Sequence, residues 1–510
     1  MADTKREIER KFEFTKGKAA RRGVPDLTGT AGIAAVSDQG TVDLDAVYYD
    51  TPDQRLAADG LTLRRRTGGA DAGWHLKLPV SPGVRDEVGA DLSDTVPPAL
   101  AALVRSRVRG AALQPQVRLV SSRRVSHLLD ADGALLAELS TDEVLAERGD
   151  ATAGWTEVEV ELADGIDPGL LDDVEKAFRA SGLRVSDAPS KLARALAETA
   201  AEPPARPGTG GPGTGGPGGT AGAHVLAYLG AQRDALVAQD PAVRRDLPDA
   251  VHQMRVATRR LRSAFKTYRA VLDRDVTDPI GEELRWLAGE LGVDRDQEVL
   301  LERLRTRLGE TDRTLLMGPV RSRLRTWNTA RRSRSRRRAL AVLDGERYVA
   351  LLDSLDALLA DPPLRKAAAR PPQKVLRKAV LRDYARLASR IDGALVLDPG
   401  HERDLALHEA RKAAKRLRYA AESAEPVLGK PVKRLAKAAK KVQSLLGDHQ
   451  DSVVARGALR GIAVQAADAG EASFTWGVLL AREEALADRY ERELPAVWAK
   501  ASGPALRAAL

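Results

Sequence analysis

The sequence predicts two domains of different fold class: an α+β domain built on an antiparallel sheet, followed by an all-α domain. Apolar and polar residues alternate in short segments of residues 1–200, as they do in half-buried strands. Residues 224–510 are rich in Ala, Leu, Arg and Glu, and their apolar residues recur every three or four positions, as in packed helices. Residues 201–223 between them are mostly Gly, Pro, Thr and Ala, which predicts a flexible linker.

Several segments of the first domain alternate strictly with period two. The expected strands cover residues 7–14, 61–66, 74–79, 135–139 and 155–162. Turn signals separate them, such as DTPD at 50–53 and DADG at 130–133. Two helical stretches interrupt the strands near 97–109 and 168–181.

The charged faces of these strands favour a closed barrel. Alternate residues of a strand share a face, so Glu7, Glu9 and Lys11 lie together, as do Glu157 and Glu159. For a single strand, a solvated charged face is the simpler interpretation. Here several strands carry clustered like charges, which repel one another unless a ligand compensates them. A closed antiparallel barrel would gather these charges in a lumen, where carboxylates and bases together suit a divalent metal and phosphate.

The second domain contains an internal repeat. VHQMRVATRRLR at 251–262 aligns with LHEARKAAKRLR at 407–418, and each copy is followed by a second related motif, LGVDRD at 291–296 and LGDHQD at 446–451. We therefore expect two similar helical bundles in tandem, related by a pseudo-twofold axis.

Basic residues form stripes along the expected helices of this domain, at spacings of three and four. Residues 251–270 and 426–447 contain no Asp or Glu, which disfavours a solvated face balanced by acidic neighbours three or four residues away. This density of cations predicts a polyanionic partner. The stripes comprise His252, Arg255, Arg259, Arg262 and Lys266, then His408, Arg411, Lys415 and Arg418, then Lys433, Lys437, Lys440 and Lys441. The histidines lack the spacing of a metal site.

Composition narrows the class of protein further. The chain of 510 residues has no cysteine, which excludes disulfides, zinc–thiolate sites and a cysteine nucleophile. The net charge of +9 is uneven, because the first 200 residues are acidic and the helical part is strongly basic. No apolar run reaches the roughly 18 residues of a membrane span, and MADTKREIERK lacks the apolar stretch of a signal peptide. We expect a cytoplasmic protein without a membrane partner.

The first domain resembles the CYTH superfamily, the triphosphate tunnel metalloenzymes, over about residues 1–200. The Glu7-x-Glu9-x-Lys11 signature carries the resemblance, together with LTLRRR, GWHLKLP, VRDE, LAELSTDEV, TEVEVEL and PSKLARAL in that order. The resemblance implies an eight-stranded antiparallel tunnel barrel that hydrolyses or cyclises triphosphates with Mg²⁺ or Mn²⁺.

The resemblance also implies roles for individual residues. The implied catalytic residues are Glu7, Glu9, Lys11, Glu157 and Glu159. The implied metal ligands are Glu7, Glu9, Glu138, Asp142, Glu157 and Glu159. The implied triphosphate ligands are Lys11, Arg64, Arg66, Lys77, Arg85, Arg118, Arg124 and Lys191. The SSRR segment leaves open whether Arg123 or Arg124 faces the lumen.

The second domain resembles the CHAD family, the conserved histidine α-helical domains, over about residues 224–500. The repeated H-x-x-R-x-x-x-[RK]-R-L-R motif carries this resemblance. It implies two pseudo-symmetric four-helix bundles whose basic residues, those of the stripes above, bind inorganic polyphosphate.

Together the two resemblances predict an enzyme that hydrolyses inorganic triphosphate, or a related short triphosphate, and binds polyphosphate. One alternative is a non-catalytic polyphosphate-binding protein associated with polyphosphate granules. Another is an adenylate cyclase of the CYTH type, although the sequence shows no nucleobase pocket. Nucleic acid is not an expected partner, because only 4% of the residues are aromatic and the basic stripes lack interleaved aromatic residues for base stacking.

Overall fold

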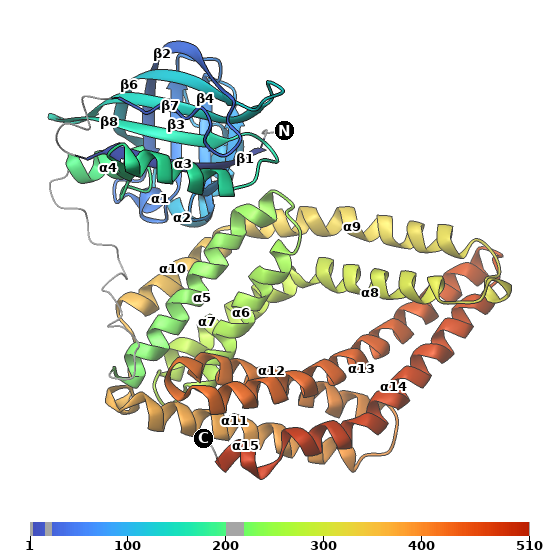
Figure 1. Cartoon of the computed structure of the whole chain (residues 1–510). Helices are drawn as coiled ribbons and strands as arrows, with labels where there is room; N and C mark the ends of the chain where they lie inside the picture. The colour runs from blue at the N-terminus through green and yellow to red at the C-terminus, as the bar shows by residue number, and fades with distance from the viewer. Residues whose placement is uncertain (1–3, 16–22, 200–218, 509–510) are drawn as a thin grey trace. The chain divides into compact units, whose positions relative to one another are not determined.

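The computed structural model describes residues 4–15, 23–199 and 219–508, without the side chains of 293–298 and 330–335. The chain divides into two compact units, Met1–Arg206 and Pro207–Leu510, which Figure 1 shows as a β-rich and a helical unit. Most of the predicted linker over 201–223 lies outside the described residues, and its last three residues already belong to the first helix of the second unit.

The first unit is a closed antiparallel barrel. Its sheet runs in the order β5-β4-β3-β2-β6-β7-β8-β1, and β1 also pairs with β5, so the eight strands form a ring; a ninth strand extends the sheet beside β1. The predicted eight-stranded barrel is therefore confirmed. The strands are β1 (Thr4–Phe14), β2 (Ala35–Asp50), β3 (Thr62–Thr67), β4 (Gly73–Ser81), β5 (Val84–Ala90), β6 (Gln114–Leu129), β7 (Leu135–Arg148), β8 (Ala151–Leu162) and β9 (Leu183–Val185).

The alternation along the strands separates an apolar outer face from a polar lumen. On the outside, Phe12 of β1 packs edge-to-face on Phe178, with ring centroids 4.7 Å apart. Phe178 belongs to α3 (Gly169–Ala180), one of the two helices that the sequence predicts; the other is α2 (Pro98–Val108). Both helices cover outward-facing strand residues, which leaves the charged residues inside the ring.

One end of the lumen is closed by α4 (Lys191–Glu198), which follows the short helix α1 (Arg55–Ala58) and the helices α2 and α3 in the chain. Leu192 and Ala195 of α4 pack against inward-facing apolar residues, including Tyr48 and Trp155. The hydroxyl of Ser190 accepts a hydrogen bond from the Ala193 amide at 3.0 Å and so caps the helix. This cap places Lys191 at the first position of α4.

The second unit is helical throughout the described residues. Its helices are α5 (Ala221–Arg244), α6 (Ala250–Thr267), α7 (Arg274–Glu290), α8 (Gly292–Gly309), α9 (Val320–Asp344), α10 (Glu346–Ala360), α11 (Pro372–Leu395), α12 (His401–Leu428), α13 (Lys430–Asp468), α14 (Phe474–Ala501) and α15 (Pro504–Ala508), with 3-10 turns at Arg313–Leu315 and Lys366–Ala369. A large core joins α5, α6, α7, α10, α11 and α12 with the first half of α13 and the last turns of α9 and α14. The other parts of α9, α13 and α14 share a second core with α8, and these four helices converge at one end of the unit (Figure 1). None of the described helices combines the length and the apolar character that a membrane-spanning helix needs.

The sequence repeat reappears as a repeated contact. Nη1 of Arg255 on α6 donates to the carbonyl of Gly292 at 3.2 Å, and a Cβ at Gly292 would lie 3.1 Å from the same guanidinium. In the second copy, a Cβ at Gly447 would lie 3.5 Å from Nε of Arg411 on α12. Each glycine thus lies against an arginine of its own repeat, which agrees with the predicted pseudo-twofold relation.

Candidate functional site

A cavity of about 390 Å³ occupies the lumen of the barrel. Side chains of both charges line it, and almost every strand contributes one. The acidic lining residues are Glu7, Glu9, Asp71, Glu87, Glu138, Glu159 and Glu161, and the basic ones are Lys5, Lys11, Arg64, Arg66, Lys77, Arg85, Arg123 and Lys191. Because the acidic and basic lining residues are nearly equal in number, the lining of the cavity carries little net charge.

Three buried carboxylates form a triad on one wall. Oxygen atoms of Asp142, Glu157 and Glu159 lie within 4.8 Å of one another. Nζ of Lys191 lies 3.0 Å from Asp142 and 2.7 Å from each glutamate. The Trp155 indole N–H donates to Glu157 at 2.6 Å and fixes its orientation. Three ionised carboxylates this close require cationic neighbours.

Two further cations reach the same triad from β6 and β1. Nε and Nη2 of Arg123 donate to the two oxygens of Asp142 at 2.7 and 2.9 Å, and Lys11 pairs with Glu159. Burial alone would raise the pKa of Glu159, but Lys11, Lys191 and Arg123 outweigh it and hold this pKa well below its usual value. The pKa of Asp142 is lowered in the same way, against its burial, by Lys191 and Arg123. Both carboxylates are therefore ionised at neutral pH.

The opposite wall has a second cluster, centred on Lys77 of β4. Its Nζ lies 2.6 Å from Glu7 and 3.2 Å from Glu87. Burial opposes the charge of Lys77, but the nearby carboxylates raise its pKa overall. Burial raises the pKa of Glu7, whereas His75, Lys77 and Arg64 lower that of Glu87 despite its burial. The lumen thus holds carboxylates on two walls.

Arginines crowd the space between the two walls. Burial, followed by the positive charges of Arg64 and Arg123, lowers the pKa of Arg66 to about 10. Asp71 pairs with Arg66, and Glu87 lies 3.7 Å from Arg64. The mutual repulsion of the arginines still costs free energy, which further anionic oxygens would offset. Planar guanidinium groups also match the oxygens of phosphate. This part of the lumen is therefore suited to a phosphate chain.

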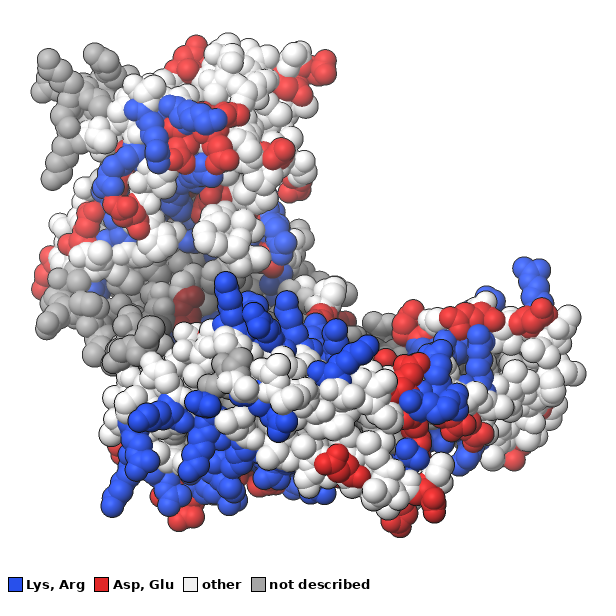
Figure 2. Space-filling view, turned by 60° about the horizontal axis from the view of Figure 1, so that its bottom comes forward, with Lys and Arg blue, Asp and Glu red and all other residues white. Residues whose placement is uncertain are grey.

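In the helical unit, the basic faces of the two sequence repeats meet where α6 contacts α12. Nη2 of Arg416 donates to the carbonyl of Lys266 at 2.8 Å. Burial, and then the charges of Arg411 and Arg259, lower the pKa of Lys415 to about 7. The structure thus brings Arg259 of one repeat beside Lys415 of the other. Figure 2 shows dense groups of Lys and Arg on the face of this unit that is turned to the viewer.

Two family models match the chain, one for each unit. The CYTH domain model matches residues 5–196, and the CHAD domain model matches residues 227–460. The chain belongs to the proteins that join a CYTH domain to a CHAD domain. CYTH domains are triphosphate tunnel metalloenzymes, and they depend on a metal ion.

Three proteins are similar to this chain over all or part of its length. The uncharacterized protein Rv2226 from Mycobacterium tuberculosis is 38% identical over 519 aligned residues, which cover 97% of this chain and 96% of that protein. The CHAD domain of the plant Ricinus communis is 28% identical with a TM-score of 0.43, covering 55% of this chain and 92% of that domain. HpAC1 from Hippeastrum, described as having a dominant triphosphatase activity, is 20% identical with a TM-score of 0.24, covering 38% of this chain and 97% of that one.

The carboxylates of the CYTH lumen suit a hard divalent cation. Oxygen donors are the ligands that Mg²⁺ and Mn²⁺ prefer, and the triad offers one from each of three side chains. Glu9 lies nearer to Lys11, at 3.4 Å, and Glu7 to Lys77. Glu138 lines the cavity outside the triad, and its side chain is 40% exposed beside His127. The triad is thus the best-formed metal site among the predicted ligands.

Two predicted phosphate ligands lie on the outer face of the barrel. Arg124 pairs with Asp38 at 2.7 Å, and Arg118 pairs with Asp45 at 2.6 Å. The reason is strand parity: Arg123 faces the lumen, so residues at even positions of β6 face outward. The assignment of Arg124 and Arg118 to the lumen is therefore wrong, and Arg123 takes the inward position. Arg85 lies at the mouth of the lumen and donates to the carbonyl of Pro189.

Sequence reasoning missed several lumen residues that a stricter use of parity would have found. Glu87 shares its face of β5 with Arg85, and Glu161 shares its face of β8 with Glu159. Tyr48 gave no signal, because a buried tyrosine in a strand is typical of any core. Its pKa is lowered, against its burial, by Arg64.

The basic stripes of the CHAD domain are partly paired with acids of the same helix or of a neighbouring helix. Arg418 lies 3.4 Å from Glu422, and Lys433 lies 2.6 Å from Glu425. The sequence argument considered only partners within the same segment, so it overestimated the number of unpaired cations. Lys266 is exposed on α6, and the remaining lysines of the α13 stripe, Lys437, Lys440 and Lys441, are exposed as well.

The CHAD histidines take different positions. His449 is buried, with Nε2 3.2 Å from Glu491 and 3.3 Å from Asp404. Arg403 and Arg456 pair with the same two carboxylates, at 3.1 and 2.7 Å. This network joins α12, α13 and α14. His252 and His408 are partly exposed, and His408 has a lowered pKa, mainly because of its partial burial.

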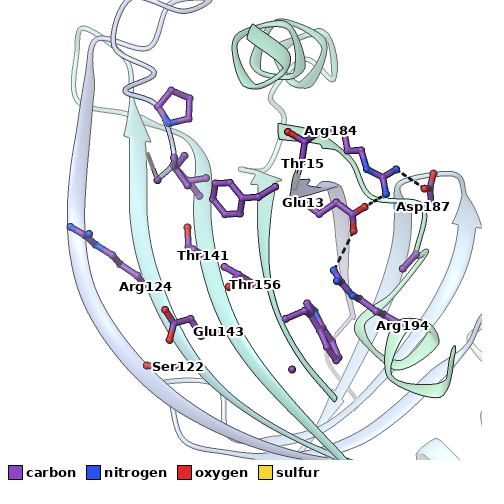
Figure 3. A pocket seen from close by; sticks show the side chains of 18 of the residues that line it. Glu13, Thr15, Ser122, Arg124, Thr141, Glu143, Thr156, Arg184, Asp187 and Arg194 are labelled. Atoms are coloured by element: carbon purple, nitrogen blue, oxygen red, sulfur yellow. Dashed lines mark hydrogen bonds and ion pairs between the residues drawn. The ribbon is translucent and has the colours of Figure 1, made fainter. Parts of the chain in front are cut away.

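A wide groove of about 1690 Å³ lies on the outer face of the CYTH barrel and is separate from the lumen. In Figure 3, Glu13 lies between Arg184 and Arg194, and the carboxylate–Arg194 distance is 3.2 Å. Arg124 and Glu143 project from the strands on its other side. Charged residues of the groove such as Arg124 and Asp187 are exposed, with 66% and 86% of their side-chain surface open to solvent, so the groove lacks the buried charges that distinguish the lumen.

Proposed function

We propose that the CYTH domain hydrolyses inorganic triphosphate or a related short triphosphate with Mg²⁺ or Mn²⁺, and that the basic CHAD face binds inorganic polyphosphate. The observation that supports this best is the division of one lumen into an arginine-rich space and a buried triad of Asp142, Glu157 and Glu159. A triphosphate needs both, because bases bind its oxygens and a divalent cation neutralises the charge that develops on the leaving group.

Different side chains of the lumen would bind the phosphate chain and position the attacking water. Arg64, Arg66 and Arg123 would bind and align the phosphate chain, since guanidinium groups pair with phosphate oxygens in two-point contacts. Glu159 is ionised and buried, so it can accept a hydrogen bond from a water and orient that water toward the terminal phosphorus. The bound cation would supply electrophilic activation of the phosphate. The proposed hydrolysis requires no covalent intermediate on any of the described lumen residues.

Phosphate release tests the proposal. We expect the full chain to release phosphate from tripolyphosphate with Mg²⁺ or Mn²⁺, and Glu159→Gln to lower kcat at least about 100-fold because it removes a triad charge at the reacting centre. The matched control is Glu143→Gln, which removes the same charge from the exposed outer face of the adjacent strand β7 and should leave the rate unchanged.

The substrates compared in that assay separate the alternatives. Release of pyrophosphate from ATP with formation of cyclic AMP would favour an adenylate cyclase. No turnover of tripolyphosphate, ATP or long-chain polyphosphate, combined with retention of long-chain polyphosphate by the full chain, would leave a polyphosphate-binding protein. Equal loss of activity in both glutamate variants would contradict the assignment to the lumen.

A further inference from the structure

The ammonium group of Lys191 occupies the middle of the carboxylate triad. Its Nζ lies 3.0 Å from Asp142 and 2.7 Å from each of Glu157 and Glu159. The three carboxylates place one oxygen each within 4.8 Å of the others, a spacing that one divalent ion can bridge. A single position in the lumen therefore suits both the lysine and the ion.

The charges of the triad are already balanced without an ion. Three carboxylates face three cations, namely Lys191, Arg123 and Lys11. A divalent ion added to this set would lie within a few ångströms of three positive groups and would be repelled. Binding of the ion therefore requires at least one of these groups to move away.

Lys191 is the cation that a divalent ion would have to displace, because its Nζ contacts all three carboxylates, whereas Lys11 contacts only Glu159 among them. Arg123 is fixed by two hydrogen bonds to Asp142, whereas Lys191 contacts the triad only through Nζ on a flexible four-carbon stem. It is the first residue of α4, next to the extended residue Ser190, and both of them line the lumen cavity. A rotation about the side-chain bonds would carry the ammonium group from the triad into the arginine-rich space.

We propose that Lys191 is a built-in competitor of the divalent ion, which yields its place in the triad when triphosphate arrives and then binds a phosphate oxygen. The inference rests on the proposed function, because it takes the triad to be the metal site. It makes binding of the ion and of the triphosphate mutually favourable, since each stabilises the position of Lys191 that the other requires. The free protein then holds the ion weakly.

Titration of the full chain with Mn²⁺ in the absence of substrate tests this, with free Mn²⁺ followed by electron paramagnetic resonance. Lys191→Met should bind the first Mn²⁺ at least about tenfold more tightly than the unmodified chain, because the competing charge is gone. Lys176→Met removes an exposed lysine that pairs with Asp173 on α3, and it should bind Mn²⁺ as the unmodified chain does. Equal or weaker binding by the Lys191 variant would overturn the proposal.

A second variant provides a test that still applies if Lys191→Met fails to fold. Lys191→Gln keeps an amide that can donate a hydrogen bond to the triad, and Mn²⁺ should raise its thermal unfolding midpoint more than that of the unmodified chain. An equal rise in both would also count against the competition. If neither the unmodified chain nor the Lys191 variants bind Mn²⁺, the proposed metal-dependent activity fails; if all bind it equally, only the role of Lys191 is wrong.

Discussion

At the scale of single residues, the lumen depends on which way each charged side chain of a strand points. Arg123 and Arg124 are neighbours in the sequence, yet one donates to the buried Asp142 and the other to Asp38 on the outside. Arg123 is 18% exposed and Arg124 is 66% exposed. The two residues therefore form a natural pair for comparing lumen and surface.

We expect Arg123→Met to lower kcat/KM for tripolyphosphate about 10- to 100-fold, because a charge-assisted contact contributes roughly 1.5–3 kcal/mol. Arg124→Met should leave kcat/KM within about twofold, since exposed ion pairs contribute little. Steady-state phosphate release from the two variants, with thermal unfolding to confirm that both are folded, provides the comparison. A larger loss in Arg124→Met would place the phosphate path outside the barrel.

For the same two arginines, the sequence alone could not predict which one faces the lumen. Period-two alternation gave the correct faces for Glu7, Glu9, Glu157 and Glu159, because those strands alternate cleanly. It could not orient SSRR, where two polar residues and two bases leave both parities polar. Only the pairing of Arg123 with Asp142 across β6 and β7 decides the matter, and that register is a property of the whole sheet.

At the scale of elements, the packing of α6 against α12 determines the electrostatic environment of the basic residues on both helices. The sequence identifies α6 and α12 as copies of one repeat, but it does not show that their basic faces meet. Lys415 on α12 is half-buried beside Arg259 of α6 and Arg411 of its own helix, with Asp451 as an acidic neighbour. The electrostatic character of this face therefore depends on how the helices pack.

This packing predicts a pH dependence for polyphosphate binding. The pKa of Lys415 is lowered to about 7, so the residue is mostly protonated at pH 6 and mostly neutral at pH 8. A polyanion prefers the protonated form, so affinity should fall as pH rises through about 7. Retention of long-chain polyphosphate by the full chain across this range, beside Lys415→Met, would measure the effect.

The Lys415→Met variant should bind with a flatter profile between pH 6.5 and 8, because the titrating charge is gone. His408 titrates lower, since burial reduces its pKa, so it contributes mainly below this window. An unchanged slope in the variant would assign the pH dependence to other groups.

At the scale of the whole molecule, the two units would bind phosphate groups, as proposed, in different surroundings. The lumen is closed at one end by α4 and holds its charges out of water, whereas the α13 lysines of the CHAD domain are exposed. The net charge of +9 conceals this contrast, because an acidic barrel is joined to a strongly basic helical unit. Screening by salt acts on exposed charges much more than on buried ones.

Raising the salt concentration should therefore separate the two activities of one chain. Exposed contacts to a polyanion release counterions, so retention of long-chain polyphosphate should weaken about 100-fold or more between roughly 50 and 200 mM KCl. Over the same range, kcat/KM for tripolyphosphate should change less than about tenfold, because its ligands lie inside the barrel. Both measurements use the full chain at fixed Mg²⁺. A parallel fall of the two would mean that triphosphate is captured first by the exposed helical face, and that the lumen does not select its substrate independently.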